Sequence, residues 1–216
     1  MGDDQTAENL KDLLATNVSS RDEAWEAAFL KALPTARFRI VSETPVAGPD
    51  GWPYLLVATD GEEPLSNLIR WLVSQGVGMV INPEKPIPDY VLSYGMVWNF
   101  RERGEFFTSA SNVRSGPVEL QNGQQVYAGP PSESYLPKEV RFILREFLKQ
   151  QKVDTPKVLM VSEDQKTWDL AVSLDSLGNP PEQEHPDIAE AMSWFLPAHY
   201  SLVLMKEHTL PGFVEL

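Results

Sequence analysis

Apolar residues follow two kinds of pattern along the chain, helical spacing and short continuous runs, and these patterns predict its elements. Spacing of three and four residues, typical of an amphipathic helix, predicts helices at about 6–15, 20–33, 65–75, 137–148 and from 186 onward. Mostly apolar runs bounded by turn residues predict strands at 36–43, 54–58, 77–81, 157–163, 167–174 and 201–205. The pattern therefore predicts an α+β protein with mixed sheets.

Turn and capping residues set the expected ends of several elements. Ser20, with Glu23 three residues later, forms a capping box that predicts the start of the second helix. Gly76 is expected to end the third helix in the left-handed conformation. The Asp60-Gly61 pair is expected to end the strand that begins at Tyr54.

The order helix, strand, strand, helix, strand occurs twice, which predicts an internal duplication. In the later part of each unit the alignment is constant at 123 residues, so that Leu65, Ile69, Trp71 and Val80 fall on Ile188, Met192, Trp194 and Val203. Two similar αββαβ units are expected, at 1–82 with an extra leading helix and at 135–216, joined by a Pro- and aromatic-rich connector or insertion at 83–134. The alternative is that two amphipathic units of this order look alike by chance.

One short motif resembles a known family. The strand Met79-Val80-Ile81-Asn82-Pro83 after an amphipathic helix, together with the helix and two strands of residues 135–175, is similar to the SseB-like family of enhanced serine sensitivity proteins. The resemblance implies a bacterial cytoplasmic α+β protein of adaptor or regulatory type. It carries no catalytic residues over to this chain.

Composition narrows the partners and the chemistry. The chain has 18 Lys and Arg against 31 Asp and Glu, a net charge of −13, which opposes binding to nucleic acid and to anionic membranes. It has no Cys, and His185, His199 and His208 are scattered, so no metal site is expected. No phosphate-binding loop or dinucleotide fingerprint is present, and no cofactor is predicted. The acidic start of the chain lacks signal-peptide features, so we expect a cytoplasmic location.

Aromatic residues and arginines are the candidates for a protein-binding surface. Two tryptophans lie off the main apolar stripe of their helices, and an aromatic cluster near 90–107 contains two arginines. The candidate residues are Trp71, Tyr94, Trp98, Arg101, Arg103, Phe106, Phe107 and Trp194. The alternative is that these aromatic rings form a second packing layer or a core beneath the connector.

The leading functional hypothesis is a non-enzymatic cytoplasmic adaptor or regulator that binds another protein, with a second copy of the chain kept as a candidate partner. One alternative is an acidic immunity-type inhibitor of a basic protein. The other is a hydrolase-like enzyme. It would use Asp60 and Asp175, which follow equivalent strands of the two units and would face each other across the repeat axis.

Overall fold

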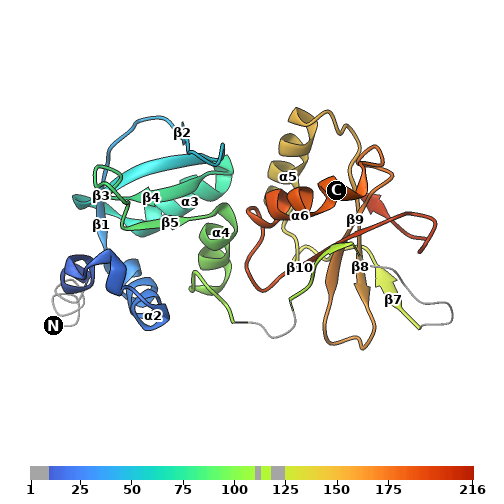
Figure 1. Cartoon of the computed structure of the whole chain (residues 1–216), viewed down its shortest axis with the longest axis horizontal. Helices are drawn as coiled ribbons and strands as arrows, with labels where there is room; N and C mark the ends of the chain where they lie inside the picture. The colour runs from blue at the N-terminus through green and yellow to red at the C-terminus, as the bar shows by residue number, and fades with distance from the viewer. Residues whose placement is uncertain (1–9, 110–112, 118–124) are drawn as a thin grey trace. The chain divides into compact units, whose positions relative to one another are not determined.

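The computed structural model describes residues 10–109, 113–117 and 125–216. The chain divides into two compact units, Met1–Thr108 and Ser109–Leu216 (Figure 1). Each unit contains helices and a mixed β-sheet, which confirms the predicted α+β class. Within the described residues, every helix is too short or too polar to cross a lipid bilayer.

The first unit is a mixed sheet with helices. Strand order is β1-β3-β4-β5, with β2 paired to β3; the β3–β4 pair is parallel and the other pairs are antiparallel. The elements are a helical segment at 10–15, η1 (Val18–Ser20), α2 (Glu23–Ala32), η2 (Leu33–Thr35), β1 (Arg37–Ile40), β2 (Val46–Ala47), β3 (Pro53–Pro64), α3 (Leu65–Gln75), β4 (Gly78–Ile81), β5 (Tyr90–Leu92) and α4 (Tyr94–Arg103).

The core of this unit follows from strand alternation and helix periodicity. Side chains that share one face of the sheet are at most 2% exposed, and they come from three neighbouring strands: Leu55, Val57, Met79, Ile81 and Leu92. Helix α3 contacts β3 and buries five apolar side chains. It ends at Gly76, whose φ of 69° confirms the predicted left-handed terminus.

Helix α2 begins at a different cap from the one expected. Asp22, not Ser20, is the N-cap, and its carboxylate accepts a hydrogen bond from the backbone N–H of Trp25 at 2.9 Å. Ser20 instead ends the short turn η1. Asp and Ser cap about equally well, so the position of the preceding turn decides which residue takes this role.

Strand β3 continues past its expected end. Ile40 and Arg39 of β1 pair with residues 57 and 58, whereas Phe38 and Arg37 pair with Glu63 and Pro64, so residues 59–62 bulge out of the ladder. The backbones approach closely here: a Cβ on Gly61 would lie 2.1 Å from the carbonyl carbon of Phe38. Asp60-Gly61 therefore makes a bulge within β3 and does not end it.

Replacing Gly61 with alanine is expected to destabilise the first unit by about 1–3 kcal/mol or more, because the new methyl group would force β1 and β3 apart. Urea denaturation followed by circular dichroism measures the loss. Gly129→Ala is the matched control, since no heavy atom lies within 4 Å of its Cβ position. Equal stability of the two variants would contradict the close approach at the bulge.

The second unit has the sheet order β11-β8-β9-β10-β6, with β7 paired to β8. The β9–β10 and β10–β6 pairs are parallel, and the others are antiparallel. Its elements are β6 (Ser115–Pro117), β7 (Tyr127–Gly129), α5 (Lys138–Gln150), β8 (Lys157–Ser162), β9 (Asp169–Ser173), η3 (Glu182–Glu184), α6 (His185–Ser193), β10 (Ser201–Met205) and β11 (Val214–Glu215). The hairpin predicted for 157–174 is confirmed.

Apolar side chains from the last segment of the chain cover one face of the second sheet. The buried cluster on that face comprises Leu159, Val161, Ala171, Val203 and Met205, against which Val126, Leu210 and Phe213 pack. Strand β11 also pairs with β8. The apolar segment after β10 thus packs on its own unit.

The two units share their connectivity. The elements α2, β1, β3, α3, β4 and the elements α5, β8, β9, α6, β10 follow the same order, and in both units the first strand pair is antiparallel and the second parallel. This agrees with the αββαβ order read from the sequence. A common origin of the two units by duplication stays a prediction.

The described parts of the expected connector, residues 83–134, do not form a separate body. Strand β5 extends the first sheet and α4 packs on α3, whereas β6 and β7 join the second sheet on β10 and β8. The connector is divided between the two units because β5, β6 and β7 pair with strand edges that would otherwise be unpaired. The aromatic side chains of α4 add to the core of the first unit. The sequence also predicts a hairpin turn at Asn122-Gly123, which lies outside the described residues.

Candidate functional site

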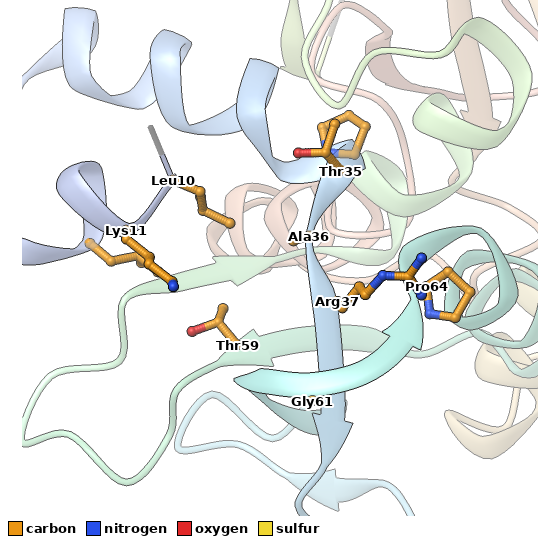
Figure 2. Close-up of a pocket in the computed structure, with 10 residues that line it drawn as sticks. Leu10, Lys11, Thr35, Ala36, Arg37, Thr59, Gly61 and Pro64 are labelled. Carbon is orange, nitrogen blue, oxygen red and sulfur yellow. The ribbon is translucent and has the colours of Figure 1, made fainter. Parts of the chain in front are cut away.

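A pocket of about 470 Å³ opens in the first unit (Figure 2). One wall is the N-terminal helical segment, a second is the chain from η2 into β1, and the third is the bulge and end of β3. The lining residues are Leu10, Lys11, Leu14, Pro34, Thr35, Ala36, Arg37, Thr59, Gly61 and Pro64. This volume lies within the range of small-ligand sites, which is roughly 300–1,000 Å³.

The lining combines apolar surface with two positive charges. Figure 2 shows Lys11 extending from the N-terminal segment toward Thr59, and Arg37 extending from β1 toward Pro64. The hydroxyl of Thr35 donates to the carbonyl of Ala32 at 2.9 Å. The pocket can therefore make apolar contacts and charge-assisted hydrogen bonds to one ligand.

Arg21 fixes the helical wall of this pocket. Its guanidinium donates to the carbonyl oxygens of Leu14 at 3.3 Å and Thr16 at 3.2 Å, and to the Asp89 carboxylate at 2.8 Å. Its side chain is 9% exposed and that of Asp89 is fully buried. The guanidinium also stacks on Trp25, 4.4 Å from the ring centroid. The wall is thus held by a buried ion pair that spans 68 residues of sequence.

Asn82 connects the Asp89 carboxylate to Thr59, which lines the pocket at the bulge of β3. Its side-chain amide donates to Asp89 at 2.6 Å and to the hydroxyl of Thr59 at 3.1 Å, and its oxygen accepts the backbone N–H of Thr59 at 2.9 Å. Asn82 has a φ of 53°, a conformation that asparagine tolerates better than most residues. One network of residues outside the lining therefore joins Leu14 and Thr59, which lie on two walls of the pocket.

The ionisation of Asp89 is set by opposing effects. Burial acts to raise its pKa, but hydrogen bonds from Lys85, Asn82 and Arg21 together hold the pKa below its usual value. Lys85 lies 2.5 Å from the carboxylate. Asp89 is consequently a charged, structural anchor of the network.

Three of the residues proposed for a protein-binding surface are buried. Tyr94 is 0%, Trp98 2% and Phe106 3% exposed. The Tyr94 hydroxyl donates to the carbonyl of Val73 in α3, and Phe106 stacks on Phe100 with 4.3 Å between ring centroids. Tyr94 and Trp98 belong to the core because α4 packs on α3, and Phe106, which follows α4, is buried against Phe100. The surface assignment is corrected for all three residues.

The other proposed surface residues remain at least partly accessible. Trp71 is 38% and Phe107 53% exposed, and Arg103 is also exposed. Arg101 pairs with its neighbour Glu102 at 2.9 Å. Trp194 lies in the second unit, is half-buried and packs edge-on against Phe195. The pocket contains none of these eight residues.

The two carboxylates of the hydrolase hypothesis have local partners in separate units. Both oxygens of Asp60 accept hydrogen bonds from Arg39 at 3.0 Å, and these lower the pKa of Asp60. The backbone N–H of Glu207 donates to Asp175 at 2.7 Å and is the main cause of its lowered pKa. A general acid needs a raised pKa, whereas the pKa of each of these two carboxylates is lowered by its local partner. This is the behaviour of a charged side chain that anchors local structure.

One carboxylate of the second unit behaves differently. Burial raises the pKa of Asp169, while a hydrogen bond from Ser201 and the charge of Arg114 oppose the rise. Arg114 lies 3.8 Å from Asp169 and 3.0 Å from Glu163, and its backbone N–H donates to the Ser201 hydroxyl. These contacts connect the ends of β6, β9 and β10. Asp169, Arg114 and Ser201 therefore have a structural role in holding these strands together.

Sequence analysis missed most residues of the pocket and its network. Lys11, Arg21 and Arg37 have the pattern of solvated charges, and Asp89 lies in a Pro-rich stretch. Sequence patterns singled out only Gly61, as part of a predicted turn, and Asn82, as part of the family resemblance. The described residues contain no group of three or more His, Asp or Glu side chains that could hold a metal ion.

Comparison with known proteins finds no matching family model, no matching curated protein and no matching solved structure. The resemblance to the SseB-like family accordingly stays a prediction.

Proposed function

We propose that the protein is a non-enzymatic cytoplasmic adaptor or regulator, and that its first unit binds a segment of a partner protein in the pocket of Figure 2. The observation that carries the proposal is the buried network from Leu14 through Arg21, Asp89 and Asn82 to Thr59. It links two walls of the pocket through groups that are already paired.

A pocket held in this way favours binding. Ordering flexible walls at the moment of association lowers affinity, and walls that are fixed beforehand avoid that loss. The lining also suits an inserted side chain, because apolar groups from three separate segments surround the space. The proposed cytoplasmic location is supported by the acidic start of the chain, which lacks signal-peptide features.

The test is affinity capture from native lysate with the full chain, Lys11→Trp and Lys31→Trp. Both lysines are exposed, but only Lys11 lines the pocket, so the first variant obstructs it and the second is its matched control. Circular dichroism checks that both variants fold. We expect one protein to be retained at stoichiometric amounts by the native chain and by Lys31→Trp, and to bind Lys11→Trp at least tenfold more weakly after purification.

Other results would overturn the proposal in distinguishable ways. A partner held equally by both variants would place the binding surface elsewhere. A basic protein that is released as salt rises, whichever variant is used, would favour the acidic inhibitor. Retention of a metabolite alone would favour an enzyme.

A further inference from the structure

The first sheet (Figure 1) carries a row of apolar side chains on the face opposite its buried core. Leu56 of β3 pairs with Val80 of β4, and Val80 pairs with Val91 of β5. The N–H of Val41, which follows β1, donates to the carbonyl of Leu56 at 2.8 Å. Directly paired residues point to the same face, so these four side chains form one row across the sheet. Val41 and Val91, at its two ends, are 43% and 45% exposed.

The second unit has the equivalent row, because β8, β9 and β10 follow the order and pairing of β1, β3 and β4. It consists of Leu159, Ala171 and Val203, which pair with one another in register. Val203 is also the residue that lies 123 positions after Val80. All three side chains of this row are at most 1% exposed. The same row is therefore covered in one unit and open at its ends in the other.

A short segment near the end of the chain covers the row of the second unit. Its side chains Leu210 and Phe213 pack on the apolar cluster to which that row belongs. Directly afterwards the segment forms β11, which pairs antiparallel with β8. One segment thus covers the face of the sheet and extends its edge at the same time.

The corresponding edge of the first sheet is unpaired in the part of the chain that the structure describes. Strand β1 is the end strand of its sheet, whereas its counterpart β8 also pairs with β7 and β11. In an antiparallel ladder, successive residues direct their backbone groups alternately toward and away from the partner strand. Because the N–H of Val41 points to β3, the N–H and C=O of Ile40 point to the open edge. The side chain of Ile40 is exposed as well.

The charge beside this edge is negative. The hydrogen bond to Asp60 is the main cause that raises the pKa of Arg39, and the charge of Glu84, which lies nearby, adds to it. Glu43 is exposed two residues after Val41. Among the described residues, which include every Lys and Arg of the chain, no cation lies within ion-pair distance of Glu43 or Glu84. Lys or Arg on a partner would complement these two charges.

We propose that the open edge and the apolar row of the first sheet bind a segment of a partner protein that carries apolar side chains beside Lys or Arg. The segment adds an antiparallel strand to β1 beside Ile40 and covers the row from Val41 to Val91. Residues 210–216 bind the second sheet in the same way. This surface includes none of the residues that line the pocket, so the inference goes beyond the proposed function and does not depend on it.

The probe is a capped peptide of residues 208–216 with Glu215→Lys, because the native segment already fits the equivalent face. One control peptide keeps the glutamate, and the other carries the lysine but has serine in place of both apolar anchors. Binding to the full chain is followed by NMR through the backbone amides of Ile40, Val80 and Val91. We expect the lysine peptide to shift these amides, the glutamate peptide to bind about fivefold more weakly, and the serine peptide at least about tenfold more weakly.

Variants of the chain identify the residues responsible. Val41→Ser should weaken the lysine peptide about fivefold, whereas Val18→Ser, which changes an equally exposed valine outside the row, should leave its affinity unchanged. Glu84→Gln should weaken it about threefold, and Glu190→Gln, at an exposed glutamate of the second unit, should not. Circular dichroism checks that the four variants fold.

The other outcomes overturn the inference in different ways. Shifts confined to the amides of Leu159 and Val203 would show that the peptide only replaces the native segment on the second unit. Equal binding of the serine peptide would contradict apolar docking, and equal binding of the glutamate peptide would contradict a basic partner. Loss of binding in Lys11→Trp would place the peptide in the pocket. Amides that no peptide shifts would leave β1 without the proposed role.

Discussion

Replacing Asp89 with alanine is expected to lower the free energy of unfolding of the first unit by about 3–5 kcal/mol. The change removes the buried carboxylate that pairs with Arg21 at 2.8 Å and with Lys85 at 2.5 Å. Arg21, only 9% exposed, would keep its charge without that partner. Hydrogen exchange measured by mass spectrometry against urea reports the loss, because peptides from the second unit serve as an internal reference.

Asp60→Ala is the matched control, since it also removes an aspartate from an arginine pair. The side chains of Arg39 and Asp60 are 53% and 65% exposed, so water already screens their attraction. Exposed pairs contribute much less to stability than buried ones. Similar losses in the two variants would contradict the anchoring role of Asp89.

The pH dependence provides a second readout of the same carboxylate. The native pKa of Asp89 is lowered, so its contribution is complete above the unfolded pKa, which is about 4, and is lost as the pH falls through the native value. The first unit should therefore lose stability below about pH 4. Asp89→Ala should show a smaller loss over that range.

Trp98→Ala is expected to destabilise the first unit by about 3–5 kcal/mol, whereas Trp71→Ala should cost less than about 1 kcal/mol. Both tryptophans were candidates for the same surface, but Trp98 is 2% and Trp71 38% exposed. Removing the buried ring leaves a closed cavity, whereas the Trp71 ring is only partly covered, so its removal costs less packing. Urea denaturation of the two variants measures the difference.

The converse result would be informative. A large loss for Trp71→Ala would show that this ring contributes to the core. A small loss for Trp98→Ala would contradict its burial and return it to the candidate surface. Intact stability in Trp71→Ala also makes this variant suitable for partner capture, which tests the sequence-based surface separately from the pocket.

Local patterns predicted most elements of the two αββαβ units, but not helix α4 or strand β5 within the expected connector. The apolar stripe of α3, its terminator Gly76 and the hairpin of β8 and β9 follow from spacing alone, because a helix or strand is defined by neighbours in sequence. Element ends were less predictable. Asp22 caps α2 in place of Ser20, since two good caps stood close together. The bulge at Gly61 depends on β1, a strand about twenty residues away.

The sequence by itself determined most helices and strands of the two αββαβ units, the α+β class and the negative net charge. Only the tertiary structure decided that Tyr94 and Trp98 are core and that Lys11 and Arg37 line one pocket. The reason is physical: periodicity records which side of an element is apolar, but it does not record which other element that side meets. The pairing of Arg21 with Asp89, 68 residues apart, exists only once the sheet has brought them together.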